Sequence, residues 1–303
     1  MFSRRQAEIL LALVILARST SYVMTKIGLH DMGTFSLLGV RFLTAFLFLL
    51  PFAWKRLSHV SGRTLLRGML LGASFFAVMA AEVSSLKTTN ASTTAFLENT
   101  AIILVPLFEA ALHKNFPKFP IIMSAMISLS GVALLTLEGG MFSLSAGECL
   151  SLLAAVFYAC SIILTDRISR KDDPLTLGIL QVGFMGIYSM IAAFIFETPQ
   201  LPTTFSEWEI ILTLAIVCSG FGFTLQPLAQ SGTTSERAGL FCALSPAGAA
   251  ILGNIFLKEK LGLAGISGTL LILLGMVSVN MINLFQKEKS SYEVRKNNSI
   301  IDT

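Results

Sequence analysis

The sequence predicts an all-α integral membrane protein with ten transmembrane helices arranged as two inverted five-helix repeats. Two observations lead to this fold class. Of the 303 residues, 54% are hydrophobic and only 13% are charged, whereas a soluble protein carries about a quarter charged residues. In addition, landmarks of the first half recur 140 or 144 residues later. Two similar halves that each have an odd number of spans must lie upside down relative to each other in a membrane.

The matched positions of the two halves define the predicted domain boundaries. The pairs are Glu82 and Gln226, Ala95 and Gly239, Gly131 and Gly275, Arg18 and Tyr158, and Arg41 and Gln181. They predict a first repeat at residues 1–140 and a second at 141–285. The remaining residues, 286–303, are polar and are expected to form a disordered cytoplasmic tail.

Ten segments are apolar enough to cross the hydrocarbon as helices, which takes about 20 residues each. They lie at 7–25, 34–53, 65–85, 91–112, 119–137, 147–165, 175–196, 209–229, 236–257 and 261–284. Short connections between them leave almost no soluble domain. Pro106, Pro227 and Pro246 fall within spans, where they indicate either ordinary helix contacts or hinges that expose backbone carbonyls to a cavity.

The basic residues predict the orientation, because cytoplasmic loops are enriched in lysine and arginine. With the N-terminus inside, the cytoplasmic side would hold Arg4, Arg5, Lys55, Arg56, Arg63, Arg67, Lys114, Lys118, Arg167, Arg170, Lys171, Arg237, Lys287, Lys289, Arg295 and Lys296. The outer side would hold only Lys26, Lys87, Lys258 and Lys260. We therefore expect a multi-pass protein of the plasma membrane with both termini in the cytoplasm. The basic residues are spread over many loops and do not form one patch, which argues against a nucleic-acid partner.

Several ionisable side chains lie at membrane depth, where each costs about 2.5–3.5 kcal/mol on insertion scales. At 1.5 Å per helical residue, Arg18 is expected at the midplane, with Arg41 and Glu98 at comparable depth and Glu82 nearer the outer surface. Glu109 is near the inner interface and is expected to extend toward the headgroups.

A central polar cavity is the predicted functional site. Its candidate substrate-binding residues are Arg18, Arg41, Glu82, Glu98, Tyr158, Gln181 and Gln226. Such a cavity suits a small polar solute with at least one charge, and a zwitterion suits it best. The alternative is that arginines and glutamates form buried ion pairs that only neutralise one another, as in a non-transporting receptor or assembly module.

No pattern in the sequence indicates catalysis, a cofactor or a metal. The histidines, His30, His59 and His113, fall in loops, and the cysteines, Cys149, Cys160, Cys218 and Cys242, lie in apolar segments without paired spacing. The usual metalloprotease and hydrolase motifs do not occur. The chain is therefore expected not to be an enzyme, and we expect a small-molecule substrate, the lipid bilayer and protons, as the coupling ion, to be its partners.

Short motifs in a fixed order make the chain resemble the EamA-type branch of the drug/metabolite transporter (DMT) superfamily. They are Gly39-Val40-Arg41-Phe42, Leu86 to Leu97, Val105-Pro106-Leu107, Gly147-Glu148, Gln181, Leu225 to Gln230, and Leu257 to Leu261 followed by Gly268 and Gly275. The resemblance covers residues 7 to 284 and implies two EamA-like repeats. It also implies export or exchange of small metabolites, often amino acids, by alternating access.

Two departures from the pattern of the superfamily affect the predicted site. Ala17-Arg18 stands where the superfamily usually has Trp-Gly, and His113-Lys114-Asn115 stands where its first half usually has a glutamate. The first departure puts a charge in place of an aromatic ring, so substrate preference does not carry over. On this hypothesis Arg18 or Arg41 holds a substrate carboxylate, while a glutamate, Glu82 or Glu98, holds an amine or exchanges a proton.

Overall fold

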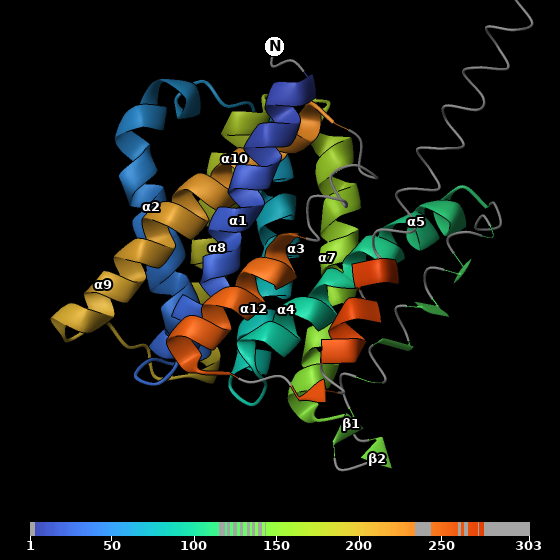
Figure 1. Ribbon diagram of the computed structural model, residues 1–303. Helices are drawn as coiled ribbons and strands as arrows, with labels where there is room; N and C mark the ends of the chain where they lie inside the picture. The colour runs from blue at the N-terminus through green and yellow to red at the C-terminus, as the bar shows by residue number, and fades with distance from the viewer. Residues whose placement is uncertain are drawn as a thin grey trace, which may run out of the picture.

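The computed structural model describes residues 4–114, 144–233, 244–259, 262–263, 266–271 and 273–275, with single positions and pairs between 119 and 142. The described chain is a bundle of helices with α1 near its centre (Figure 1). Its helices are α1 (Arg4–Gly28), α2 (Thr34–Leu57), α3 (Gly62–Leu86), α4 (Ala91–Asn99), α5 (Ala101–Leu112), α7 (Ala146–Ser169), α8 (Pro174–Phe196), α9 (Phe205–Thr213), the π-helix η1 (Leu214–Phe223), α10 (Thr224–Ser231) and α12 (Leu244–Leu257).

Seven helical stretches of the described chain are long and apolar enough to span a membrane. They are Arg5–Gly28, Thr34–Leu57, Gly62–Leu86, Ala91–Leu112, Ala146–Ser169, Pro174–Phe196 and Phe205–Ser231. These match the first four and the sixth to eighth predicted spans. The predicted spans at 119–137, 236–257 and 261–284 lie partly outside the described residues, and the predicted tail at 286–303 lies wholly outside them.

One feature of the secondary structure was not predicted. Between the two halves, strands β1 (Leu137–Glu138) and β2 (Met141–Phe142) pair antiparallel. Each strand has only two residues, so the pair does not form a sheet layer.

Capping side chains determine where α7 and α8 begin. Ser145 accepts a hydrogen bond from the backbone of Glu148, whose carboxylate in turn accepts from the backbone of Ser145, which completes a capping box at the start of α7. Asp173 caps α8, and Pro174 takes the first helical position, where its missing N–H costs nothing. These caps fix where the spans enter the membrane.

Two of the apolar stretches are not regular α-helices near their middles. The stretch Ala91–Leu112 breaks at Thr100, which separates α4 from α5. The Thr100 hydroxyl donates to the carbonyl of Leu97 over 2.6 Å, so the break is stabilised locally. It lies before Pro106, so the proline itself is not the breakpoint.

The second irregular stretch contains η1, a π-helix of ten residues. Pro227 follows in α10 and has no N–H to donate to the carbonyl of Phe223, one helical turn earlier. Gly220 and Gly222 also lower the preference for regular α-winding. Wide turns of this kind occur mostly at functional sites.

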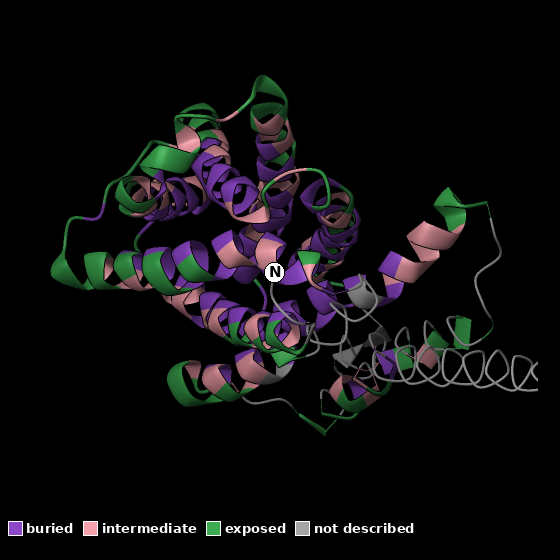
Figure 2. Ribbon diagram, turned by 90° about the horizontal axis from the view of Figure 1, so that it is seen from above, coloured by how far each residue is buried: buried purple, intermediate pink, exposed green. Residues whose placement is uncertain are grey.

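Helices of the first half of the chain pack against helices of the second half. Helix α2 lies along α8, α3 packs against both α7 and α8, and α1 packs against α12, η1 and α10. In the view along the bundle, buried positions face the centre and exposed positions lie at the periphery and in the loops (Figure 2). The exposed rim includes many large apolar side chains, such as Phe52 and Phe194, as expected of a surface that faces lipid.

Polar contacts fasten α2 to α8 at both ends. At one end Arg56 pairs with Asp173 over 2.9 Å. At the other, the Glu197 carboxylate accepts hydrogen bonds from the backbone N–H groups of Phe35 and Ser36, at 3.0 and 3.1 Å. Glu197 therefore caps a helix of the other half of the chain.

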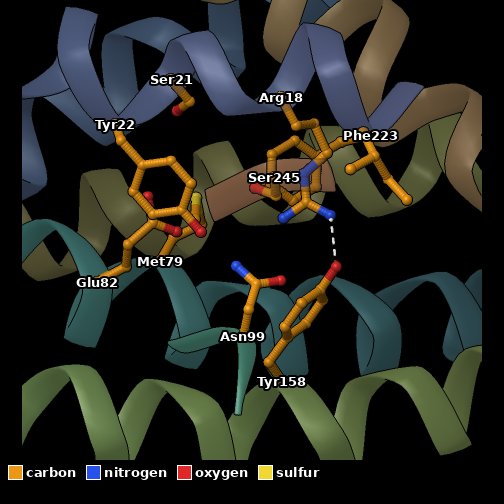
Figure 3. A pocket seen from close by; sticks show the side chains of 10 residues that line it. Arg18, Ser21, Tyr22, Met79, Glu82, Asn99, Tyr158, Phe223 and Ser245 are labelled. Atoms are coloured by element: carbon orange, nitrogen blue, oxygen red, sulfur yellow. Dashed lines mark hydrogen bonds between the residues drawn. The ribbon is translucent and has the colours of Figure 1, made fainter. Parts of the chain in front are cut away.

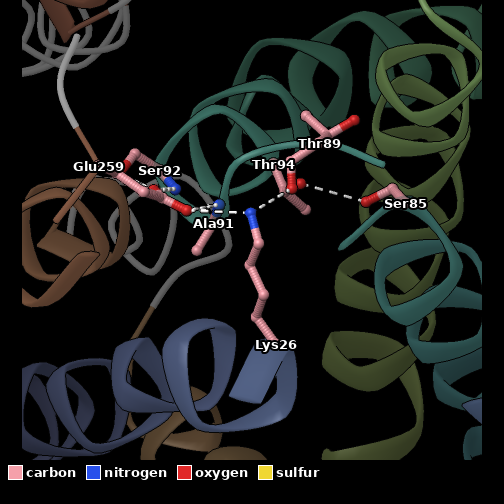
Figure 4. A network of polar contacts seen from close by, with 7 residues as sticks. All are labelled: Lys26, Ser85, Thr89, Ala91, Ser92, Thr94 and Glu259. Atoms are coloured by element: carbon pink, nitrogen blue, oxygen red, sulfur yellow. Dashed lines mark hydrogen bonds and ion pairs between the residues drawn. The ribbon is translucent and has the colours of Figure 1, made fainter. Parts of the chain in front are cut away.

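A third polar contact, which we call the Glu259 clasp, joins α1, α4 and the residues after α12 (Figure 4). The Glu259 carboxylate accepts from the backbone N–H groups of Ala91 (2.9 Å) and Ser92 (3.2 Å) at the start of α4. It also accepts from the Lys26 ammonium, which lies 3.1 Å away and donates to the carbonyl of Thr89 as well. The clasp is thus a helix cap and an ion pair combined.

Candidate functional site

Arg18 is held at the centre of the bundle by neutral partners. Its Nη1 donates to the Tyr158 hydroxyl over 3.1 Å and to the Gln226 side-chain oxygen over 2.7 Å. The guanidinium carbon lies 4.1 Å from the centre of the Phe223 ring, a stacking distance at which a cation and an aromatic face attract each other. A Cβ atom at Gly222 would come within 2.7 Å of the Arg18 side chain, so glycine is required for this approach.

Arg41, on α2, is fully buried and reaches side chains of α1 and η1. Its Nε donates to the hydroxyl of Ser219 over 2.8 Å, and its Nη1 donates to the hydroxyl of Ser21 over 2.8 Å. Its Nη2 has no hydrogen-bond partner. A buried guanidinium nitrogen without a partner is costly, which makes this atom available to a ligand.

The two buried glutamates lie close to each other and to both arginines. Glu82 interacts electrostatically with Arg18, Arg41 and Glu98. Glu98 accepts a hydrogen bond from the Tyr22 hydroxyl over 2.9 Å, and its carboxyl group lies within hydrogen-bonding reach of the Glu82 carboxyl. Two carboxyl groups in such contact can share a proton.

A small cavity separates the opposite charges of this cluster. Its lining includes Arg18, Tyr22, Glu82, Asn99 and Tyr158, which come from α1, α3, α4 and α7 (Figure 3). The cavity measures about 10 Å³, which is about the room that one water needs. The described conformation is therefore closed around the cluster.

Direct ion pairs do not hold the cluster together. Among the described residues, no arginine nitrogen of Arg18 or Arg41 lies within ion-pair distance of Glu82 or Glu98; each arginine instead hydrogen-bonds to hydroxyl or amide groups. The alternative of buried ion pairs that neutralise each other is thus not the arrangement found. The charges remain separated on the two sides of the cavity.

The structure brings most of the predicted site residues together. Arg18, Tyr158 and Gln226 are hydrogen-bonded, and Glu82 lines the same cavity as Arg18. Arg41 and Glu98 do not line this cavity but are close enough to Arg18 to interact with it electrostatically. Gln181 does not join them: it is buried in α8, lies outside the cavity, and its amide makes no hydrogen bond to any described residue. Glu109 makes a contact elsewhere in the chain and is not part of the site.

Several residues of the site were not singled out from the sequence. They include Ser21, Tyr22, Asn99, Ser219 and Phe223. Tyr22 lies four residues after Arg18, on the same helical face, and this spacing was a signal that would have identified it. The positions of Ser219 and Phe223 depend on the π-helix, whose winding has no such signal.

Apolar spanning helices closed around a buried, charge-balanced cavity define a class of protein, the membrane transporters of small solutes. The chain belongs to the EamA-like transporter family, which matches residues 5–137 and, a second time, residues 145–281. Family membership places it among multi-pass membrane transporters of the drug/metabolite superfamily and favours neither an enzyme nor a non-transporting receptor.

Relatives and a solved structure agree with this assignment. The chain is 27% identical over 285 residues to an uncharacterized transporter of Archaeoglobus fulgidus, with 92% of this chain and 87% of that one covered. A second uncharacterized transporter of the same organism is 27% identical over 264 residues, with 84% and 90% covered. One crystal structure of a protein aligns with a TM-score of 0.69 at 19% identity, covering 92% of this chain and 98% of that one; at this identity the likeness concerns the fold.

Proposed function

We propose that the protein is a secondary transporter of a small zwitterionic metabolite, such as an amino acid, which it exports or exchanges across the plasma membrane by alternating access. Arg18, with Arg41 behind it, receives the carboxylate of the solute. Glu82 and Glu98 face its ammonium group from the other side. Tyr158 and Gln226 hold the Arg18 guanidinium in place. Gln181 enters the proposed site only in a conformation that differs from the one described.

One observation carries this proposal: opposite charges are buried together without pairing. Charged groups in a membrane interior are costly, and the arginines and glutamates would lower that cost by forming ion pairs. Instead, Arg41 Nη2 has no hydrogen-bond partner, and the Glu98 carboxyl contacts the Tyr22 hydroxyl and the Glu82 carboxyl but no cation. A zwitterion supplies the missing partner for each, a carboxylate for the arginines and an ammonium for the glutamates.

The helix contacts support an inverted repeat of two five-helix halves, residues 1–140 and 141–285. Helix α3 packs along α7, and their counterparts in the other half, the α9–η1–α10 stretch and α1, also pack together. Helix α2 packs along α8, its own counterpart. A pseudo-twofold axis relates contacts in this way. The double family match divides the chain at a similar point, and the distribution of the basic residues supports a cytoplasmic position for both termini.

Proton coupling through Glu98 is part of this proposal. Its hydrogen bond from Tyr22 and its contact with the Glu82 carboxyl allow the carboxyl to take up or release a proton as the cavity changes its exposure. We expect Glu98→Gln to abolish the pH dependence of exchange while preserving the side-chain shape. Initial rates across pH 5 to 8, measured for wild type and Glu98→Gln in proteoliposomes, check this. An unchanged pH profile in the variant would assign proton coupling elsewhere.

Counterflow in proteoliposomes tests the proposed function itself. Liposomes preloaded with one unlabelled solute are challenged with the same labelled solute, across amino acids, nucleosides, organic cations and organic anions. We expect exchange for one or more zwitterions and none for simple cations. Protein-free liposomes give the leak rate. Exchange of organic cations alone would contradict a site built around Arg18, and exchange of no solute at all would refute the transporter mechanism proposed.

A further inference from the structure

Asn99 presents a buried acceptor to the cavity. Its side chain is only 1% exposed, and its Oδ1 has no hydrogen-bond partner. Its Nδ2 donates to the carbonyl of Ala95 over 2.7 Å. Because a carbonyl only accepts hydrogen bonds, this contact fixes which end of the amide is the nitrogen. The oxygen is therefore the end left for a ligand, and only a hydrogen-bond donor satisfies it.

The position of Asn99 is set by the break between α4 and α5. Asn99 is the last residue of α4, and Thr100 interrupts the helix before α5 begins. Figure 3 shows the Asn99 side chain reaching from this break toward the Arg18 guanidinium, beside Tyr158. Interrupted helices in transporters place polar groups at the substrate. The helix break thus delivers an amide oxygen to the centre of the bundle.

The charged side chains around Asn99 indicate which kind of hydrogen-bond donor its side-chain oxygen would bind. Glu82 lines the same cavity, and Glu98 precedes Asn99 in the chain and interacts electrostatically with Arg18. Two carboxyl groups beside an acceptor favour a donor that carries positive charge. An ammonium group has three N–H donors, enough to reach both an amide oxygen and a carboxylate.

We propose that Asn99 determines the specificity of the transporter for a protonated amine. Its Oδ1 accepts a hydrogen bond from the ammonium group of a zwitterionic solute whose carboxylate lies at Arg18. This inference rests on the proposed function and deepens it, because it names the residue that separates amine-bearing solutes from carboxylates of the same skeleton. A site built to hydrogen-bond one group rejects analogues that lack it, since its own buried atom is then left without a partner.

Competition in counterflow measures this specificity. Three inhibitors with one carbon skeleton are compared against the transported zwitterion: the amine, the analogue with a hydroxyl group in place of the amine, and the analogue with hydrogen there. In wild type we expect the amine to compete best and the hydrogen analogue worst, with an amine-to-hydrogen ratio of about tenfold or more. In Asn99→Leu, which has a similar shape but no acceptor, the ratio is expected to fall toward one.

Two variants control the experiment. Asn99→Asp keeps an acceptor and adds negative charge, so it is expected to retain or increase the amine preference, and it stays informative if Asn99→Leu does not fold. Asn90→Leu makes the same chemical change at the outer end of α4, where the side chain is exposed and makes no capping hydrogen bond; its ratio is expected to equal that of wild type.

The possible results separate this inference from the proposed function. Wild-type exchange with an unchanged ratio in Asn99→Leu, or with a reduced ratio in Asn99→Asp, overturns the role of Asn99 and leaves the transporter assignment in place. Absence of exchange in wild type refutes the proposed function instead.

Discussion

Arg18→Ala is expected to reduce exchange on the order of 100-fold, because the arginine supplies the charge that receives the substrate carboxylate. Two charge-assisted hydrogen bonds of about 1.5–3 kcal/mol each account for a loss of this size. Its Nη1 is already occupied by Tyr158 and Gln226, so the other guanidinium nitrogens would make these bonds. Counterflow of the identified solute, at equal reconstituted protein, is the measurement.

Loss of packing must be separated from loss of charge in this experiment. The Arg18 stem fills the space between Gly222 and Phe223, and alanine leaves that space empty. Arg18→Met fills most of it without the charge, while Arg18→Lys keeps the charge but not the planar, stacked guanidinium. We expect Met to transport as poorly as Ala and Lys to recover in part. Full activity of a correctly folded Arg18→Met protein would rule out a carboxylate site at this residue.

Glu259→Ala is expected to destabilise the protein by about 2–4 kcal/mol, because it removes the cap of α4 and the ion pair with Lys26 together. The side chain is only 7% exposed, so water replaces these contacts poorly. Lys26→Met removes only the ion-pair partner and is expected to cost less than Glu259→Ala. Thermal unfolding in detergent at pH 7, followed by loss of the monodisperse chromatographic peak, measures both. Equal melting temperatures for Glu259→Ala and wild type would contradict a stabilising role of the clasp.

The pH dependence of the clasp follows from the carboxyl group. Burial raises the pKa of Glu259, but hydrogen bonds from Ala91 and Ser92 and then from Lys26 outweigh burial, so the pKa lies below its ordinary value. A carboxyl whose pKa is lower in the folded protein stabilises the fold above its unfolded pKa, and this stabilisation is lost as pH falls through the folded pKa. The difference in melting temperature between wild type and Glu259→Ala is therefore expected to be largest at pH 7 and to become smaller in acid.

The sequence predicted the apolar spans and the gathering of Arg18, Glu82, Tyr158 and Gln226 better than it predicted the hydrogen-bond partners of the charges. Helix geometry converts residue number into position along a span, which is why these residues could be expected at a common level. Partner choice depends on which faces pack together. Arg18 therefore bonds to Tyr158 and Gln226 and not to a glutamate, and Gln181, at an equally suitable depth, lies apart.

The π-helix η1 changes which residues of its stretch face the centre, and this accounts for Ser219 and Phe223, two of the residues that were missed. Tyr22 and Asn99 lie on regular α-helices. Asn99 follows directly after the predicted Glu98 on α4, where neighbouring side chains point about 100° apart. The positions of glycine and proline indicate that the stretch with η1 is irregular. They do not indicate how far the residues that follow are rotated about the helix axis.

The clasp and the α2–α8 contacts have a consequence for apparent affinity. In the described chain, α2 and α8 are tied together at both ends, by Arg56 with Asp173 and by Glu197 with the start of α2. Under the proposed alternating access, a solute that enters beside Glu259 needs a form in which the clasp is open, and the contacts of the clasp make that form a minor population. Its measured dissociation constant is the intrinsic one divided by that population, so each 1.4 kcal/mol stored in the clasp weakens binding from that side about tenfold.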